Sequence, residues 1–385
     1  MAPDLPQEAS LETATSRQVL AGHVGHLTSS QEAALVTLKE RLAETGYYTP
    51  SLEGREASSS DVDLVRFLRA RKFDVQGAFD QFTSAADWRR TQNIDQLYDT
   101  FSLTEFEQAR QLYPQWTGRR DNFGLPVYLY KVGALSKEKT DAYVKTTPER
   151  LEQRMVALYE HMVQFVVPFC SAVPHGHQET PISGCATIVD ISNVSLRRFW
   201  QLKDHMQRAS TLATARYAET LGAIYLVGAP GFFSTVWGWI KKYPGTVEKI
   251  HILPSSPSAI LSILCQHLPL SSIPRAYGGQ LDWDFDAPGP LLDQAAREVL
   301  GREEVPVGPV RWDERRGRIR AVGEGRVEEE EAGTSGAAQV ATGSEGQVRG
   351  RVGGKEEVFV TPPATPGEVP AAEAQLAQRL EETKL

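Results

Sequence analysis

Cysteine is scarce in this chain: its 385 residues contain three, Cys170, Cys185 and Cys265. No two of them have the CxxC spacing, and an odd number cannot all pair in disulfides, which favours a reducing compartment. A secretory signal is missing as well, because the first residues, MAPDLPQEASLETATS, have neither a basic region nor an apolar core. These absences predict a soluble protein of the cytoplasm.

The signatures of common enzyme classes are also missing. The sequence has no phosphate loop of the GxxxxGK[ST] type, no GxGxxG after a strand, no HExxH and no GxSxG. A formal net charge of −8 argues against a general nucleic-acid binder. We therefore predict a protein that is not an enzyme and needs no cofactor.

One group of residues has the side chains that bind metals: Cys170, His175, His177 and Cys185. They lie on either side of a polar loop between a predicted helix and a predicted strand, so their spacing allows a metal site. A free buried cysteine near exposed loop histidines is the commoner arrangement. We therefore predict no metal here.

One long apolar run without a charged residue covers residues 222–240, GAIYLVGAPGFFSTVWGWI. It approaches the length of a membrane-spanning helix, but one proline and two glycines interrupt it at residues 228–231. Residues 223–227 therefore predict a buried strand, and residues 232–243 predict a helix that is apolar on nearly all sides. Such a helix is expected to contact both an apolar interior and a bilayer surface.

The amino-terminal part of the chain predicts a small helical unit. Residues 1–27 are polar and are expected to be disordered. Helix starts occur at Thr28 and again at residues 58–61, and a third helix is predicted over residues 75–92. Together these helices predict a unit over residues 28–100.

From Pro126 onward, strands alternate with helices. The predicted strands are residues 126–132, 185–191, 223–227 and 249–253, and the predicted helices are residues 148–167, 196–212, 232–242 and 256–267. Apolar strands that alternate with helices predict an α/β fold with a mainly parallel sheet, covered by helices on at least one face.

The end of the chain has a different composition. Residues 301–385 are rich in glycine and charge, above all after Arg311, and contain few aromatic residues. Such a segment cannot bury enough apolar surface to fold alone, so we predict a largely disordered acidic and glycine-rich tail.

Four basic residues cluster near the second predicted helix: Arg66, Arg69, Arg71 and Lys72. Neighbouring aspartates could pair with them on a solvated helix face. Alternatively they form a phosphate site, because arginine offers a planar fork to phosphate oxygens and lysine adds a compact charge. The residue types alone leave both interpretations open.

Several longer segments of the sequence resemble the CRAL-TRIO family, and in particular fungal-type phosphatidylinositol/phosphatidylcholine transfer proteins. These segments are GHLTSSQEAAL (25–35), LVRFLRARKFDV (64–75), GLPVYLYKVGAL (124–135), CATIVDISNVSL (185–196) and AIYLVGAPGFFSTVWGWIKK (223–242). The resemblance implies a lipid-binding domain over residues 101–300, in which a sheet and helices enclose an apolar cavity. It also implies that residues 232–242 belong to a gate helix that swings on membranes.

The resemblance further implies which residues hold the inositol-lipid headgroup. The corresponding residues here are Arg71, Lys72, Glu219, Thr246 and Lys249. Cationic donors suit a phosphodiester, and a carboxylate suits the ring hydroxyls. Residues 241–248, KKYPGTVE, are two residues shorter than the family pattern and lack its Asp-Pro pair, which removes one acceptor for a hydroxyl.

A second headgroup region is implied at Tyr128, Phe165, Cys185 and Thr187. Tyr128 and Thr187 match the family pattern, whereas Phe165 and Cys185 replace two hydroxyl-bearing residues. A hydroxyl lost from a buried phosphate contact costs about 1–3 kcal/mol. We therefore expect the second ligand to differ from phosphatidylcholine, or phosphatidylcholine to bind weakly.

The resemblance implies a function for the whole chain: a monomeric carrier of one phosphatidylinositol, and of a second lipid, that presents phosphatidylinositol to a lipid kinase at Golgi or endosomal membranes. The residues expected to contact the membrane through the gate helix are Phe232, Phe233, Val236, Trp237, Trp239 and Ile240. Two alternatives stay open. One is a carrier or sensor of a sterol or haem in the same fold, and the other is an α/β enzyme acting on a phosphorylated small molecule.

Overall fold

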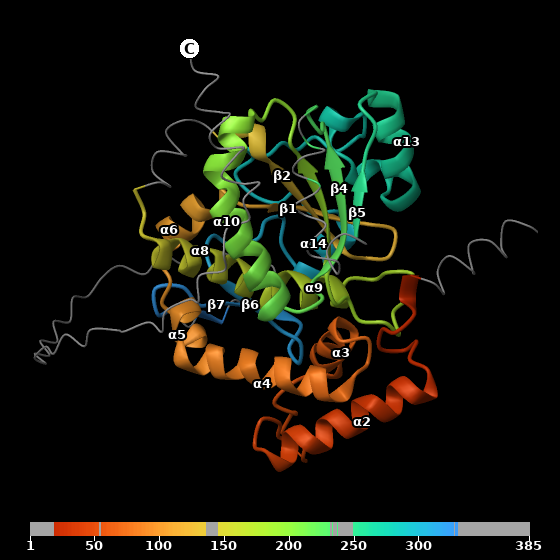
Figure 1. The fold of residues 1–385 in the computed structure, drawn as a ribbon, viewed down its shortest axis with the longest axis vertical. Coiled ribbons are helices and arrows are strands. Elements are labelled where there is room, and N and C mark those ends of the chain that lie inside the picture. The colour runs from red at the N-terminus through yellow and green to blue at the C-terminus, as the bar shows by residue number, and fades with distance from the viewer. Residues whose placement is uncertain are drawn as a thin grey trace, which may run out of the picture. The chain divides into compact units, whose positions relative to one another are not determined.

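The central element of the computed structural model is a sheet of five strands in the order of the sequence (Figure 1). The strands are β1 (Gln115–Arg120), β2 (Pro126–Lys131), β3 (Cys185–Asp190), β4 (Leu221–Val227) and β5 (Ile250–Ile252). Strand β1 pairs antiparallel with β2, and β2 to β5 are parallel. The structure describes residues 19–53, 55–135, 145–231, 233, 237, 249–326 and 328–329. The chain divides into two units, and all the described residues belong to the first unit, Met1–Thr334. The predicted mainly parallel sheet is confirmed.

The connections between the parallel strands carry the large helices. Helices α8 (Pro148–His161) and α9 (Val167–Ala172) lie between β2 and β3, with a π-helical turn, Met162–Val166, between them. Helix α10 (Leu196–Ala215) lies between β3 and β4, and α13 (Pro257–His267) follows β5. Crossovers between neighbouring parallel strands are right-handed, so successive crossover helices fall on the same face of the sheet.

Residues that alternate along the strands lie on two different faces of the sheet. One face packs against α13 and the segments that follow it, and is filled by Val127, Leu129, Ala186, Ile188, Tyr225 and Val227. The other face, on the side of α8 and α10, is formed by Tyr128, Tyr130, Thr187, Val189, Ile224 and Leu226. The second face is the one that borders a cavity.

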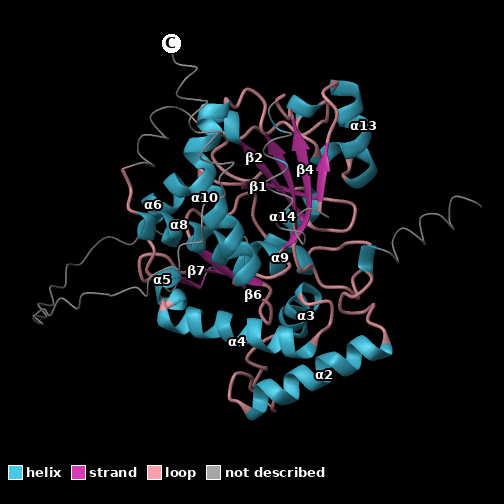
Figure 2. Ribbon diagram, in the orientation of Figure 1, coloured by secondary structure: helices cyan, strands magenta, loops and turns pink. Residues whose placement is uncertain are grey.

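The amino-terminal helices are α2 (Ser29–Glu44), α3 (Asp61–Ala70) and α4 (Val75–Thr91), shown side by side in Figure 2. Capping boxes begin α2 and α3, with Thr28 and Ser60 as the capping residues. The buried leucines Leu38, Leu42 and Leu68 hold the three helices together. Two further helices, α5 (Ile94–Asp99) and α6 (Leu103–Arg110), connect them to the sheet. The three predicted helices are confirmed, whereas α5 and α6 were not predicted.

The end of residues 1–27 is ordered rather than disordered. Residues 19–27 pack onto the helical unit through Val24 and Leu27, and Leu20 is 6% exposed; glycines at positive φ, Gly22 and Gly25, lie in the turns of this segment. The Arg69 side chain donates a hydrogen bond to the carbonyl oxygen of Ala21. The expectation for this part of the segment is wrong because its polarity hides a few anchoring contacts, and residues 1–18 lie outside the described residues.

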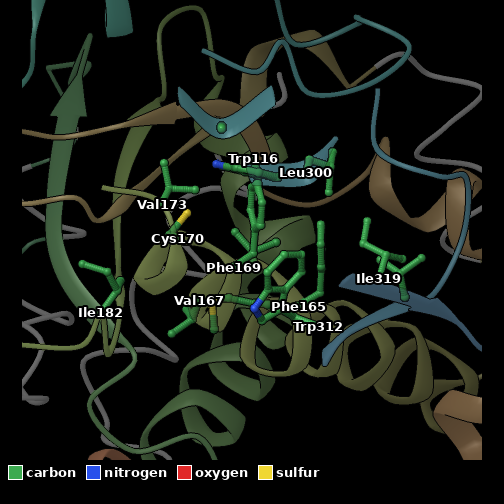
Figure 3. Close-up of a cluster of buried hydrophobic side chains, with 14 of the residues drawn as sticks. Trp116, Phe165, Val167, Phe169, Cys170, Val173, Ile182, Leu300, Trp312 and Ile319 are labelled. Atoms are coloured by element: carbon green, nitrogen blue, oxygen red, sulfur yellow. The ribbon is translucent and has the colours of Figure 1, made fainter. Parts of the chain in front are cut away.

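The prediction of a disordered tail from residue 301 is also wrong for its first part. Residues 310–321 form an antiparallel hairpin of β6 (Val310–Asp313) and β7 (Arg318–Ala321), extended by β8 (Glu328–Glu329). The alternation in VRWD and RIRA places Trp312 and Ile319 on one face, which is buried against α9 (Figure 3). The short helix α14 (Gln294–Leu300) packs into the same core. The overall polarity concealed this period-2 pattern.

One helical stretch, Pro148–Ala172, is long and apolar enough to cross a membrane by length and composition alone. It spans α8, the π-helical turn and α9, and 56% of its apolar window is buried inside the protein. Apolar side chains that already pack within a fold are typical of a core helix. Phe165, Phe169 and Cys170 of this stretch lie in the buried core shown in Figure 3.

Candidate functional site: an apolar cavity beside a charged cluster

A cavity of about 350 Å³ lies between the sheet and helices α8 and α10. Ligand-binding pockets typically measure roughly 300–1,000 Å³ and are mostly apolar. None of the described residues that line this cavity is charged. Its lining residues are Tyr113, Pro114, Tyr128, Tyr130, Val132, Met155, Leu158, Tyr159, Met162, Cys185, Thr187, Val189, Ile191, Val194, Met206, Ala209, Ala213, Thr220, Leu221, Ile224, Leu226, Pro230 and Phe233.

Four polar side chains form a neutral group in the cavity wall. Tyr128 and Thr187 lie opposite each other on β2 and β3, and the Sγ atom of Cys185 lies 3.8 Å from Oγ1 of Thr187. The fourth is Tyr159, which comes from α8. Burial raises the pKa of the Cys185 thiol to about 11 and raises the pKa of both tyrosines, so all four groups are uncharged at neutral pH.

The two tyrosine hydroxyls are available to a ligand. Neither Tyr128 nor Tyr159 hydrogen-bonds to another residue in the part of the chain that the structure describes. Tyr159 is held from its other side, because its ring stacks on Tyr217 with centroids 4.7 Å apart. A polar ligand group in this part of the cavity would therefore meet two unused phenol donors.

Phe165, the fourth residue predicted for the second headgroup, is not among the residues that line the cavity. It is fully buried in the core shown in Figure 3, where it stacks on Phe169 at 5.5 Å and meets the edge of Trp116 at 6.2 Å. Tyr159, six residues earlier, reaches the cavity and was not predicted. The helical spacing of Met155, Leu158, Tyr159 and Met162 is the signal that could have identified the cavity-facing side of α8.

A charged cluster lies next to the starts of strands β4 and β5. The carboxylate of Glu219 forms an ion pair with Nζ of Lys249 at 3.0 Å, and Nη2 of Arg69 lies 3.6 Å from its other oxygen. The three side chains are between 19% and 23% exposed, so the cluster is half-buried and open to solvent on one side. It adjoins the cavity, because Thr220 follows Glu219 and its carbonyl oxygen accepts the backbone N–H of Cys185.

The structure therefore brings together two of the five residues predicted for the inositol-lipid headgroup, Glu219 and Lys249. The RARKF segment contributes Arg69 rather than the predicted pair. Arg71 ends α3 and Lys72 follows in the left-handed region with φ 51°, and both side chains are exposed. Their role in headgroup binding stays a prediction, and Thr246 lies outside the described residues.

Two of the predicted gate-helix residues are described. Phe233 is 8% exposed, lines the cavity and packs against Leu226 of the sheet. The ring of Trp237 lies 6.0 Å from that of Phe233. Phe233 lines the cavity and Trp237 does not, and the role of both residues in a gate stays a prediction. The other four, Phe232, Val236, Trp239 and Ile240, lie outside the described residues.

A second arginine–glutamate contact joins the helical unit to α8. Glu160 is fully buried, and Arg89 of α4 donates to both of its carboxylate oxygens at 2.8 and 2.7 Å. The hydroxyl of Tyr217 donates to Glu160 at 2.5 Å, and Gln164 donates a further hydrogen bond. The carboxylate of Glu160 is therefore completely shielded from solvent, whereas the side chain of Glu219 is 19% exposed.

The candidate metal residues do not converge. No group of three or more His, Cys, Asp or Glu side chains among the described residues could hold a metal ion. Cys170 and Cys185 are buried and unpaired. His177 stacks on Phe123 instead.

Comparison with known proteins gives a consistent assignment. The profile of the CRAL/TRIO domain matches residues 110–279, and that of the CRAL/TRIO N-terminal domain matches residues 34–84. The Sec14 cytosolic factor of Schizosaccharomyces pombe is 34% identical over 260 residues, which cover 67% of this chain and 85% of that protein. The phosphatidylinositol/phosphatidylcholine transfer protein SFH7 of Arabidopsis thaliana is 31% identical over 219 residues, 56% of this chain and 38% of that protein.

The fold agrees with these sequence comparisons. The crystal structure of Sfh5 superposes with a TM-score of 0.50 at 18% identity, over 71% of this chain and 96% of that one. At this identity the likeness concerns the fold alone. The predicted resemblance is confirmed: the chain belongs to the CRAL/TRIO family.

Proposed function

We propose that this protein is a phospholipid-transfer protein that carries one phosphatidylinositol molecule at a time and needs no cofactor besides the bound lipid. The observation that carries the proposal is the position of the uncharged cavity directly beside the Arg69–Glu219–Lys249 cluster. An amphiphile with a charged headgroup and apolar chains requires both surroundings next to each other. The name of the similar Arabidopsis thaliana protein, a phosphatidylinositol/phosphatidylcholine transfer protein, supports the same ligand class.

The acyl chains would occupy the cavity between the sheet and helices α8 and α10. Removing apolar surface from water contributes about 25 cal/mol per Å², which favours extraction of the chains into a site without charges. The phosphodiester would lie between the cationic donors Arg69 and Lys249, assisted by the exposed Arg71 and Lys72. The carboxylate of Glu219 would accept hydrogen bonds from the inositol hydroxyls.

Exchange requires the cavity to open. Phe233 lies both at the cavity and at the start of the predicted gate, so movement of this segment would expose the lipid. The aromatic residues of the gate suit the headgroup boundary of a bilayer, which would lower the free energy of opening. We infer a monomer that works between the cytosol and Golgi or endosomal membranes and presents its lipid to a phosphatidylinositol kinase.

The neutral group of Tyr128, Tyr159, Cys185 and Thr187 would bind the polar part of the second lipid. A thiol is a weaker hydrogen-bond donor and acceptor than a hydroxyl, so Cys185 offers little to a phosphate oxygen. Phosphatidylcholine is therefore expected to be the poorer cargo.

Transfer of labelled lipids between vesicles tests this proposal. We expect phosphatidylinositol to be transferred roughly tenfold or more faster than phosphatidylcholine. Cys185→Ser should raise phosphatidylcholine transfer, whereas the matched control Cys265→Ser, at an exposed position, should leave it unchanged. Equal rates for the two lipids in the unaltered protein would contradict the second-lipid hypothesis, and no phosphatidylinositol transfer would contradict the function itself.

A second candidate function is a carrier or sensor of another hydrophobic ligand, such as a sterol or haem. It is favoured by the absence of charge among the described cavity residues and by the two unused tyrosine hydroxyls. Native mass spectrometry of protein purified from a eukaryotic host distinguishes the two. A sterol or haem as the sole bound ligand would favour the second candidate, and bound phosphatidylinositol would favour the first.

A further inference from the structure

The ordered segment of residues 19–27 brings a histidine into the charged cluster. Nδ1 of His23 lies 2.7 Å from Nη1 of Arg69, the arginine that faces Glu219. The same Nδ1 atom lies 3.2 Å from the carbonyl oxygen of Leu20. One ring nitrogen thus lies next to both a hydrogen-bond donor, Arg69, and a hydrogen-bond acceptor, the carbonyl oxygen of Leu20.

The two contacts of Nδ1 cannot both be hydrogen bonds at once. A guanidinium only donates, so the contact with Arg69 requires a bare Nδ1 and places the hydrogen of a neutral ring on Nε2. The carbonyl oxygen of Leu20 only accepts, so that contact requires a hydrogen on Nδ1. Protonation of His23 therefore exchanges one bond for the other and releases Arg69 from the ring, while Nη1 of Arg69 keeps the carbonyl oxygen of Ala21 as a partner.

Charge balance connects this exchange to ligand binding. With a neutral His23, the two cations and one carboxylate of the cluster sum to +1, counted over Arg69, Lys249 and Glu219. Binding of one phosphodiester anion together with one proton on His23 leaves that sum unchanged. The separation of 3.6 Å between Arg69 and Glu219 exceeds hydrogen-bond length, so the guanidinium has donor capacity left for an anion.

We propose that His23 is a proton-coupled residue of the anion site: it is neutral and holds Arg69 when the cluster is empty, and it takes up a proton and releases Arg69 when a phosphodiester binds. The proposal rests on the proposed function, since it requires a phosphate-bearing ligand in this cluster. It names a residue for headgroup binding on the segment before the first helix, outside the positions that sequence resemblance supplied.

The surroundings of His23 keep it neutral in the empty protein. Burial and then the charge of Arg69 lower the pKa of His23 to about 4, and His26 and Lys249 act in the same direction. The groups that face it are Arg69 from α3, Lys249 before β5, His26 on its own segment, and Glu219 through Arg69. A bound anion opposes the effect of the two cations and so raises the pKa of His23.

The consequence is a pH-dependent affinity. Because the bound form of His23 has the higher pKa, binding takes up a proton between the two pKa values, and affinity rises as the pH falls through that range. Linkage of one proton changes the affinity by up to about tenfold per pH unit. We expect the affinity for an inositol phosphodiester to rise about tenfold between pH 7.5 and pH 5.5.

Titration calorimetry on the full chain tests the coupling. The probes are short-chain phosphatidylinositol and glycerophosphoinositol, whose phosphodiesters stay anionic throughout this pH range. Measurement in buffers with different ionisation enthalpies counts the protons taken up. His23→Gln supplies an amide oxygen that accepts from Arg69 but does not titrate, so it should abolish proton uptake and flatten the pH profile while retaining binding at pH 7.5.

The matched control is His26→Gln, which removes a histidine three residues away that contacts Glu179 instead of Arg69. It should take up protons as the unaltered protein does. Proton uptake with both probes would assign the effect to phosphate recognition by the cluster, and uptake with the lipid alone would assign it to the headgroup held by a filled cavity; either result supports the proposal. Equal proton uptake in His23→Gln and the unaltered protein overturns it, and so does binding without any pH dependence, with the proposed function intact. Absence of binding of both probes at every pH overturns both.

Discussion

Two arginine–glutamate contacts join the amino-terminal helices to the rest of the fold, and they differ in almost every physical respect. Arg89 and Glu160 form a bidentate pair around a carboxylate that is fully buried. Arg69 and Glu219 lie 3.6 Å apart, are partly exposed, and share their surroundings with Lys249 and His23. In the first contact, protein donors occupy both carboxylate oxygens. In the second contact, the cationic side chains keep N–H donors that an anionic ligand could use. We therefore expect the first contact to serve stability, and the proposed function assigns binding to the second.

The largest expected effect on the free energy of unfolding is at the buried contact between Arg89 and Glu160. Arg89→Ala leaves Glu160 without its cationic partner, and loss of one member of a buried pair destabilises a protein by about 3–5 kcal/mol. Chemical denaturation followed by circular dichroism measures the change. The matched control is Arg90→Ala, because Arg90 is exposed and its contacts, an ion pair with Asp87 and a position over the ring of Tyr47, lie at the surface, so a much smaller loss is expected. Equal losses for both variants would show that the two contacts do not differ in stability.

A second buried histidine, His161, follows Glu160 in α8 and should make the free energy of unfolding depend on pH. Burial lowers the pKa of His161 to about 3, next to the hydroxyl of Tyr98 at 3.4 Å. In the unfolded chain the pKa of this histidine is about 6.5. The unfolded state therefore binds a proton at a higher pH than the folded state does, and the free energy of unfolding falls as the pH drops from 6.5 toward 3. Between pH 7 and pH 4.5 we expect a loss of about 2–3 kcal/mol from this residue.

The measurement is the free energy of unfolding in urea at several pH values. His161→Phe, whose ring suits the neighbouring Phe106 and Phe165, should flatten the acid dependence. His23→Gln should flatten it as well, since burial and the neighbouring charges lower the pKa of His23 to about 4. An acid dependence that His161→Phe leaves unchanged would contradict the role of this buried histidine.

The smallest effect on stability is expected at the open contact. Glu219→Gln removes a half-buried charge whose partners also face solvent, so we expect a change below about 1 kcal/mol in the free energy of unfolding. Phosphatidylinositol transfer should nevertheless fall about tenfold, because the carboxylate is replaced by a weaker acceptor. Phosphatidylcholine transfer by the same variant is the internal control. A large loss of stability with unchanged transfer would make this contact structural like the first.

Much of the fold could be predicted from local patterns. The four parallel strands and the helices from α2 to α4 were predicted because their apolar residues repeat at the period of the element and their capping residues mark the starts. Strand β1 was missed, since its sequence QWTGRR carries a glycine and two arginines and does not resemble a strand. The hairpin of β6 and β7 was missed for a similar reason, as its buried Trp312 and Ile319 alternate with charged residues.

The site was predictable only in part. Glu219 and Lys249 were identified through family resemblance and do lie in contact. The cluster also contains Arg69 and His23, and the side chain at residue 165 points into the core while Tyr159 reaches the cavity. These facts depend on the rotation of each helix about its axis and on which segments pack together.

The sequence by itself determined the order of the four parallel strands and of helices α8, α10 and α13, the alternation of the strand faces and the absence of enzyme signatures, because these depend on neighbours along the chain. The tertiary structure alone decided which arginine faces Glu219, which tyrosine faces the cavity and that residues 19–27 bring a histidine to the charged cluster. Contacts of this kind join residues far apart in the sequence, as between Arg69 and Glu219. Their geometry is fixed by the packing of whole elements, which no local pattern records.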